Sequence, residues 1–169
     1  DVLSKKCENL SHSGAEFVVM ASNTPHKVFK AVNEFCPVPM ISIIEATKAE
    51  AVRRNVKKLC LLGTPFTMTE TFYQDVFDGS GIELVVPSSA DQAFIGKTLF
   101  EEIELGIINE STKKEYLNII ARVDEANRID GVIMGCTELP MILKPEDIAG
   151  EYFDTLKIHV KEIVRECKK

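Results

Sequence analysis

The chain has 169 residues, 45% of them hydrophobic, and a formal net charge of -6. This length is enough for one domain or two small lobes with a buried core. Lysine and arginine are scattered rather than clustered, which argues against nucleic acid as a partner. No stretch approaches the ~18 consecutive apolar residues that a membrane span needs.

In chain order, strand patterns alternate with amphipathic helical patterns. We expect strands at residues 17–21, 40–44, 59–63, 82–87 and 131–135. We expect helices at residues 25–35, 45–57, 66–77, 91–107, 112–127 and 155–167. Thr112 followed by Glu115 reads as the capping box of the fifth helix. Strands that alternate with helices of this length predict βαβ units and parallel sheets.

The first residues, DVLS, fit a helix that is already under way. Domains of this α/β type usually begin with a strand. We therefore expect further residues upstream of this sequence.

The five cysteines and three histidines show neither a disulfide pattern nor the spacing of metal ligands. The number of cysteines is odd, no pair has CxxC spacing, and the first residues do not read as a secretory signal. We expect free thiols in a reducing compartment, hence a cytoplasmic protein, and no metal site.

Two segments of the chain are nearly the same. Residues 18–24 read VVMASNT and residues 132–138 read VIMGCTE, so each apolar run is followed by a small residue and then Ser22 or Cys136. In parallel sheets, ligands bind at the carboxyl ends of strands. The similarity therefore predicts one site built from two related halves, with a hydroxyl on one side and a thiol on the other.

Polar helix starts follow three of the expected strands, at Thr24, Thr64 and Thr137. Each would direct free backbone N–H groups and the positive end of a helix dipole toward the same edge of a sheet. Such a place holds a carboxylate or a phosphate. Because no GxGxxG or GxxxxGK[ST] run is present, we expect a small carboxylate rather than a nucleotide.

Cys136 is the best single candidate for chemistry. A helix N-terminus lowers the pKa of a thiol by about one unit or more, whereas the other cysteines read as structural. Ser22 lacks the GxSxG context of a hydrolase nucleophile. His26 either orients the turn after the first strand or acts as a base, and His159 is either structural or part of the site.

Four motifs in register resemble the aspartate/glutamate racemase family over essentially the whole chain. They read SNTPH at residues 22–26, LGT at 62–64 with Thr67, GCTELP at 135–140, and FDT at 153–155 with His159. Members of that family usually begin some tens of residues earlier, with a strand and a glycine-rich turn, which agrees with the expected upstream residues.

The resemblance implies a fold of two Rossmann-like lobes with parallel sheets, related by a pseudo-two-fold axis, and an active site in the cleft between them. One lobe would combine residues 1–45 with 140–169, and the other would hold 46–139. It also implies a homodimer that needs no cofactor and acts on a small amino acid or dicarboxylate.

The implied activity is racemisation of aspartate or glutamate by removal and return of the α-proton. Carried over by position, Cys136 is the catalytic cysteine of one face, and Ser22 takes the place of the cysteine of the other. The positions that hold the substrate's carboxylates and amino group are Asn23, Thr24, Thr64, Thr67 and Thr137. The possible orienting residues are His26, Glu138 and His159.

Serine at position 22 departs from the two-cysteine pattern of the family. A hydroxyl is a far weaker acid than a thiol and gains activity only beside a base. Four interpretations remain open: an atypical Ser/Cys pair, a native cysteine that was replaced by Ser22, one-cysteine chemistry such as decarboxylation or isomerisation of small dicarboxylates, and ligand binding without catalysis. Thr137 and Glu138 after the cysteine favour the racemase branch over the decarboxylase branch.

Overall fold

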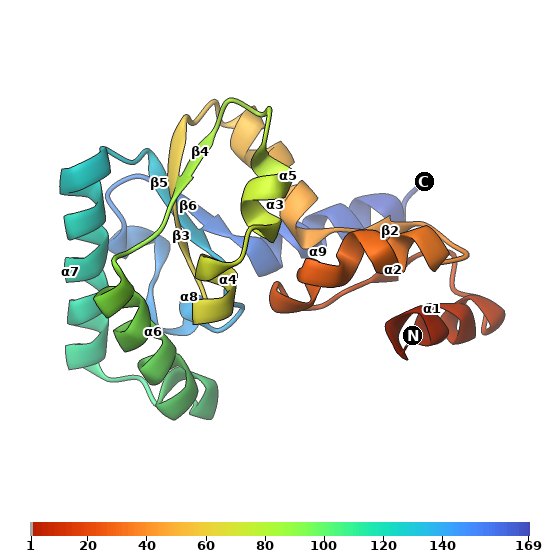
Figure 1. The fold of residues 1–169 in the computed structure, drawn as a ribbon, viewed down its shortest axis with the longest axis horizontal. Helices are drawn as coiled ribbons and strands as arrows, with labels where there is room; N and C mark the ends of the chain where they lie inside the picture. The colour runs from red at the N-terminus through yellow and green to blue at the C-terminus, as the bar shows by residue number, and fades with distance from the viewer. Residues whose placement is uncertain (1) are drawn as a thin grey trace.

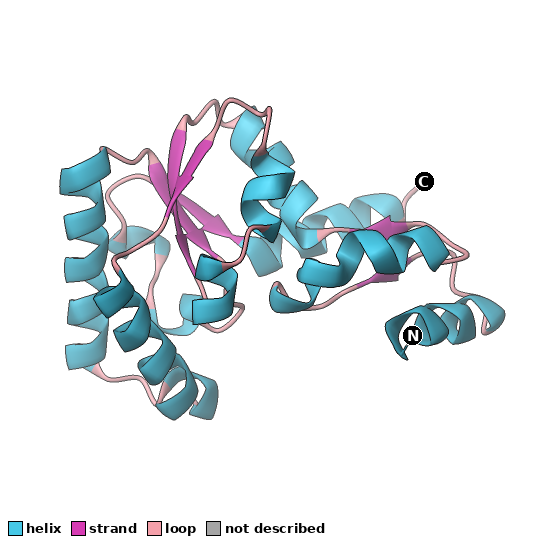
Figure 2. Cartoon of the chain, in the orientation of Figure 1, coloured by secondary structure: helices cyan, strands magenta, loops and turns pink. Residues whose placement is uncertain are grey.

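The computed structural model describes residues 2–169 and contains two parallel sheets (Figures 1 and 2). The small sheet pairs β1 (Val18–Val19) with β2 (Met40–Ile41). The large sheet has the strand order β4-β3-β5-β6. Its strands are β3 (Lys58–Leu62), β4 (Glu83–Val85), β5 (Gly131–Met134) and β6 (Glu151–Asp154). The expected α/β architecture with parallel sheets is confirmed.

Helices connect these strands and cover both faces of the large sheet. The α-helices are α1 (Val2–His12), α2 (Phe29–Phe35), α3 (Ile43–Arg53), α4 (Pro65–Thr69), α5 (Phe72–Phe77), α6 (Ser89–Glu101), α7 (Glu110–Asn127), α8 (Leu139–Ile142) and α9 (Thr155–Glu166). Short 3₁₀ helices lie at η1 (Thr24–Val28), η2 (Ile103–Leu105) and η3 (Pro145–Asp147). Within residues 2–169, no helix is long and apolar enough to cross a membrane.

Strand β3 lies in the middle of the core because its side chains alternate between two apolar layers. Cys60 and Leu62 pack with α6 and α7 on one face, whereas Leu59 and Leu61 pack with α3 and α5 on the other. All four side chains are fully buried. A strand buried on both faces reads as a continuous apolar run, which is the pattern of this segment.

The small sheet lies at the other end of the molecule, beside α1 and α2 (Figure 1). Its own small core contains the buried residues Cys7, Val18 and Val32. Helix α9 packs along α3, and α3 follows β2 directly. These two helices therefore connect the small sheet to the large one.

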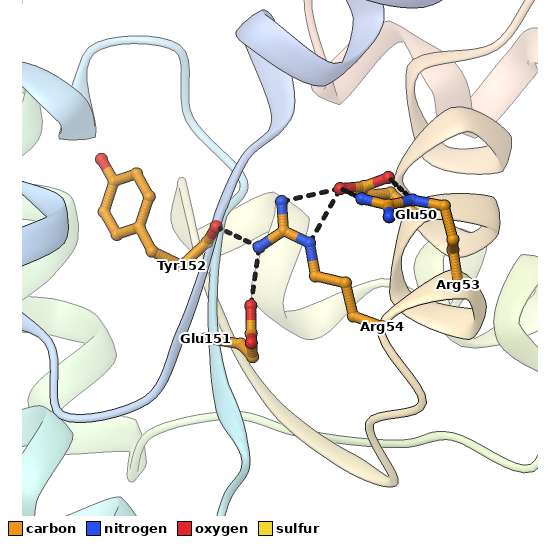
Figure 3. A network of polar contacts seen from close by, with 5 residues as sticks. All are labelled: Glu50, Arg53, Arg54, Glu151 and Tyr152. Atoms are coloured by element: carbon orange, nitrogen blue, oxygen red, sulfur yellow. Dashed lines mark hydrogen bonds and ion pairs between the residues drawn. The ribbon is translucent and has the colours of Figure 1, made fainter.

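An ion-pair network fixes the end of α3 to the start of β6 (Figure 3). The Arg54 guanidinium lies 2.7 Å from a Glu151 carboxylate oxygen and donates to the Tyr152 carbonyl oxygen at 3.2 Å. On its other side, its Nε donates to Glu50 at 2.8 Å, and Glu50 also accepts from Arg53. The contacts of Arg54 bridge two segments that are 97 residues apart in the chain.

Three sequence-based expectations need correction. The second strand ends at Ile41, not at residue 44, because Ser42 caps α3 by accepting the Glu45 backbone N–H at 3.2 Å. The expected helix at 66–77 is two helices, since the backbone is extended at Glu70. Helix α7 begins at Glu110, and Thr112 is not its cap: the buried Thr112 hydroxyl donates to Glu102 at 2.6 Å.

Strand β6 was not expected from the sequence. It is parallel to β5 and completes the large sheet, although it lies within residues 140–169, which were assigned to the lobe of the first strands. The division of the chain into lobes at residues 45 and 140 stays a prediction.

Candidate active site

A cavity of about 760 Å³ lies where the segment after β1 meets the carboxyl ends of β3 and β5. It therefore opens between the small-sheet segment and the large sheet, at the edge where parallel strands place their ligands. Its lining residues are Ala21, Ser22, Asn23, Thr24, Thr64, Pro65, Phe66, Phe100, Glu104, Gly135, Cys136, Thr137 and Glu138. Both Ser22 and Cys136 line this one cavity, as their matched positions predicted.

The Cys136 thiol lies beside a carboxylate. Its Sγ donates to Glu138 Oε2 at 3.0 Å, and the Thr137 hydroxyl donates to the same oxygen at 2.8 Å. Glu138 was expected only as a possible orienting residue. In the structure it is the polar group in direct contact with the thiol, so it is placed to receive the thiol proton.

The expected low pKa of Cys136 is wrong. Burial, followed by the Glu138 carboxylate, raises the pKa of the thiol from 9.0 to about 12. The helix that follows, α8, begins only at Leu139 and has four residues, so its N-terminus is not at the sulfur. The hydrogen bond to Glu138 holds the thiol proton in place, and the nearby carboxylate disfavours a second negative charge.

On the opposite side, Ser22 is exposed and lines the cavity. His26 does not contact its hydroxyl. Instead, the His26 ring bridges two backbone groups: Nε2 accepts the Ile43 N–H at 3.2 Å, so Nδ1 carries the proton and donates to the Ser22 carbonyl oxygen at 2.9 Å. Burial lowers the pKa of His26 to about 4. The structure therefore places His26 as a neutral residue that orients the turn.

Three threonines gather on the floor of the site. Thr64 caps α4 by accepting the Thr67 N–H at 3.2 Å, and the two hydroxyls lie 3.1 Å apart. The Thr24 hydroxyl lies 3.5 Å from that of Thr67. Thr67 itself is fully buried and lies beneath the cavity lining, so it supports Thr24 and Thr64 rather than facing the cavity.

The side chains of Asn23 and His159 are both buried and held by hydrogen bonds. Asn23 lines the cavity, and its side-chain amide bonds to the hydroxyls of Tyr73 and Thr155. His159 donates from Nε2 to the Ile41 carbonyl oxygen at 3.1 Å. It is buried outside the lining residues, so it supports β2 and stands away from the cavity.

Sequence reasoning gave no role to Glu104, Tyr73 and Thr155. Glu104 reaches the cavity from η2. Glu104 and Glu138 are the charged residues in the described lining. Thr155 lies in a motif that was recognised, but Tyr73 carried no sequence signal. Among residues 2–169, no three His, Cys, Asp or Glu side chains are grouped so that they could hold a metal ion.

The fold and this cavity define an α/β protein with two parallel sheets, in which a thiol and a hydroxyl line one cavity. The family model described as Asp/Glu/Hydantoin racemase matches residues 1–163. The chain therefore belongs to that family, as the sequence motifs indicated.

Several known proteins are similar to this chain. The crystal structure of an aspartate racemase homologue from Pyrococcus horikoshii OT3 is 37% identical and superposes with a TM-score of 0.91, over 99% of this chain and 74% of that one. The broad specificity amino-acid racemase RacX of Bacillus subtilis is 27% identical over 79% of this chain. A glutamate racemase of Aliivibrio fischeri is 29% identical over 83% of it. The chain spans 57% and 50% of the lengths of these two relatives.

Proposed function

We propose that the protein is a cofactor-independent amino-acid racemase, with aspartate and glutamate as the first candidate substrates. The observation that carries the proposal is the placement of Cys136 and Ser22 on one cavity, with Glu138 in hydrogen-bond contact with the thiol. The names of the relatives, which include aspartate, glutamate and broad specificity amino-acid racemases, support it.

In the proposed reaction, Glu138 takes the proton from Cys136 Sγ, and the thiolate takes the α-proton of the amino acid. The electron pair of the C–H bond stays on the substrate as a carbanion-like charge next to the carboxylate. A thiolate whose conjugate acid has a pKa of about 12 is rarely formed, but once formed it is a stronger base than an ordinary thiolate. A proton returns either from Cys136 to the same face or from the Ser22 hydroxyl to the other face. In the second case the exposed Ser22 alkoxide regains a proton from water, and Glu138 gives its proton to water.

Neutral donors would hold the substrate. Thr24, Thr64 and Asn23 line the cavity with neutral polar side chains, and Thr137 also lines it, with its hydroxyl hydrogen already donated to Glu138. Donors fixed before the reaction stabilise charge that develops on the carboxylate in the transition state. Glu104 would face the ammonium group of the substrate, since opposite charges attract across a partly buried cavity. A homodimer and a cytoplasmic location stay predictions.

Proton NMR in D₂O tests this proposal directly. The protein is incubated with L- and D-aspartate and with L- and D-glutamate, and loss of the α-proton signal is followed together with chiral analysis of the products. We expect exchange that Cys136→Ser abolishes and that Cys167→Ser, at an exposed cysteine outside the cavity, leaves unchanged. No exchange with any of the four amino acids would overturn the racemase proposal, and exchange that survives Cys136→Ser would refute Cys136 as the base.

One observation favours a second candidate, one-cysteine chemistry on small dicarboxylates. In residues 2–169 the structure gives the Ser22 hydroxyl no hydrogen-bonded base, and His26 is turned to the backbone. A site with a single proton donor suits decarboxylation or cis–trans isomerisation. Turnover of a substituted malonate or of maleate, without α-proton exchange of amino acids, would favour this candidate. Amino-acid binding without either reaction would identify a non-catalytic relative.

A further inference from the structure

A chain of three buried hydrogen bonds runs beneath the cavity and joins its two sides. The Thr155 hydroxyl donates to the Met134 carbonyl oxygen at 2.7 Å. Asn23 Nδ2 donates to the Thr155 oxygen at 3.1 Å, and the Tyr73 hydroxyl donates to Asn23 Oδ1 at 2.6 Å. Tyr73 and Thr155 are fully buried and Asn23 is 2% exposed. Four separate elements meet here: the end of β5, the start of α9, the turn after β1, and α5.

The directions of these bonds follow from one backbone group. The Met134 carbonyl oxygen can only accept, so it takes the single hydroxyl proton of Thr155. The Thr155 oxygen must then accept from Asn23, which turns the NH₂ group of the amide toward Thr155. The carbonyl oxygen of the amide therefore faces Tyr73, whose hydroxyl must donate. The sheet thus fixes which way the Asn23 amide is turned.

This orientation matters because an amide presents a donor from one end and an acceptor from the other. Asn23 Oδ1 is occupied by Tyr73, and one of the two Nδ2 hydrogens is occupied by Thr155. The second Nδ2 hydrogen has no protein partner in the described part of the chain, and Asn23 lines the cavity beside Ser22. What the residue offers to a ligand is a donor, which suits a carboxylate.

We propose that Tyr73 and Thr155 are positioning residues, which lock the Asn23 amide so that its N–H points at a substrate carboxylate. The inference rests on the proposed racemase function for the identity of the substrate. The same chain ends at Met134, two residues before Cys136, so it also ties the Ser22 side of the site to the strand that carries the thiol. Without these hydrogen bonds, the segment that carries Ser22 and the strand that precedes Cys136 would be free to shift relative to each other.

Two substitutions, Tyr73→Phe and Thr155→Val, remove hydrogen bonds from this chain while keeping the packing. Thr155→Ser restores the hydroxyl and serves as the rescue variant. The chain offers a matched control pair in the other core layer, where the buried hydroxyls of Tyr116 and Thr98 lie 3.1 Å apart. Tyr116→Phe and Thr98→Val remove buried hydroxyls that are hydrogen-bonded to each other and not to Asn23.

The first readout needs no catalysis. In ¹⁵N–¹H NMR spectra, the side-chain amide signals of Asn23 are identified by their loss in Asn23→Asp, and the protein is titrated with L- and D-aspartate. We expect the Asn23 signals of the wild-type protein to move on titration. We expect Tyr73→Phe and Thr155→Val to shift them in the free protein and to weaken the aspartate response. Thr155→Ser and both control variants should behave like the wild type.

The second readout is the exchange reaction. The hydrogen bond from Asn23 to the substrate carboxylate involves a charged group, so its loss weakens binding strongly. We expect Tyr73→Phe and Thr155→Val to raise KM about 10- to 100-fold. We expect kcat to change by less than about threefold, since the thiol and its carboxylate are untouched. A merely structural role would lower the amount of folded protein and leave KM as it was.

Two results would overturn the inference: Asn23 signals that do not respond to aspartate, or effects of Tyr73→Phe and Thr155→Val no larger than those of the control pair. Failure of the proposed function is a different result, namely no α-proton exchange in the wild-type protein. In that case the amide signals still decide whether Tyr73 and Thr155 orient Asn23 toward a bound carboxylate.

Discussion

Glu138→Gln should change the chemistry of Cys136 in two opposite ways. The wild-type thiol has a pKa of about 12 against an ordinary 9.0, so its thiolate fraction at pH 8 is about a thousandfold below that of an ordinary thiol. Glutamine removes the negative charge of Glu138, which raises the pKa after burial and the hydrogen bond between the two side chains, and it leaves burial, the first cause, in place. The pKa should fall but stay above 9.0.

The assay is alkylation of Cys136 by iodoacetamide between pH 7 and 10.5, with each of the five cysteines resolved by peptide mass spectrometry. Because only thiolate reacts, we expect the wild-type rate to rise tenfold per pH unit without levelling off. Glu138→Gln should raise the rate at pH 8 by at least about tenfold, with about a thousandfold as the ceiling. The α-proton exchange should fall in the same variant, because the acceptor of the thiol proton is gone.

Glu104→Gln is the matched control. Glu104 lines the same cavity, but its charge is the smallest of the causes that raise the Cys136 pKa. Its removal should raise the alkylation rate less than Glu138→Gln does. A wild-type rate that levels off at or below pH 9, or a larger effect of Glu104→Gln, would refute the reasoning about the thiol.

Two further predictions concern stability. His26 is neutral and buried, with a pKa of about 4 against an ordinary 6.5, so the unfolded state binds its proton first as the pH falls. We expect this difference to contribute about 3 kcal/mol to the free energy of unfolding above pH 6.5 and to be lost toward pH 4. Urea titrations at several pH values measure this dependence on pH, which His26→Gln should flatten. Arg54→Ala should lower the free energy of unfolding by about 1–3 kcal/mol, since it leaves Glu151 and the Tyr152 carbonyl oxygen without their donor. Arg53→Ala, at a more exposed partner of the same Glu50, should cost clearly less; equal losses would contradict the role of the network in Figure 3.

Much of the fold could be predicted because its signals are local. The alternation of apolar strand runs with amphipathic helices predicted the parallel sheets, and β3 and β5 lie where their patterns placed them. β6 has only four residues, two of them acidic at its ends, and it becomes a strand by pairing with β5. Such pairing between distant segments leaves no local pattern.

The site was predictable in position but not in electrostatics. The similarity of the two segments that follow β1 and β5 predicted one cavity lined by Ser22 and Cys136, and both residues line it although their strands belong to different sheets. The sign of the pKa change at Cys136 depended on burial and on a side-chain contact with Glu138, neither of which the local sequence determines. Tyr73 reaches Asn23 across 50 positions of the chain, so only the folded structure reveals it.

The two sides of the cavity differ in their reactive atom and also in whether a carboxylate is hydrogen-bonded to it, and this difference has a measurable consequence. Cys136 has a carboxylate at 3.0 Å to take its proton, whereas the hydroxyl of Ser22 has no such partner among the described residues. Racemisation has an equilibrium constant of one, so the asymmetry cannot appear as unequal kcat/KM for the two directions. It must appear in the fate of the α-proton.

We therefore expect one enantiomer to exchange its α-proton in D₂O faster than it racemises, because in the proposed reaction Cys136 removes and returns a proton on its own face. The other enantiomer should exchange only as it inverts. Ser22→Cys supplies a more acidic donor on the second face and should raise the ratio of inversion to exchange for the first enantiomer, with His26 still turned to the backbone. Equal exchange and inversion for both enantiomers of the wild-type protein would mean that Ser22, or a group beyond residues 2–169, already acts as a full partner of the thiol.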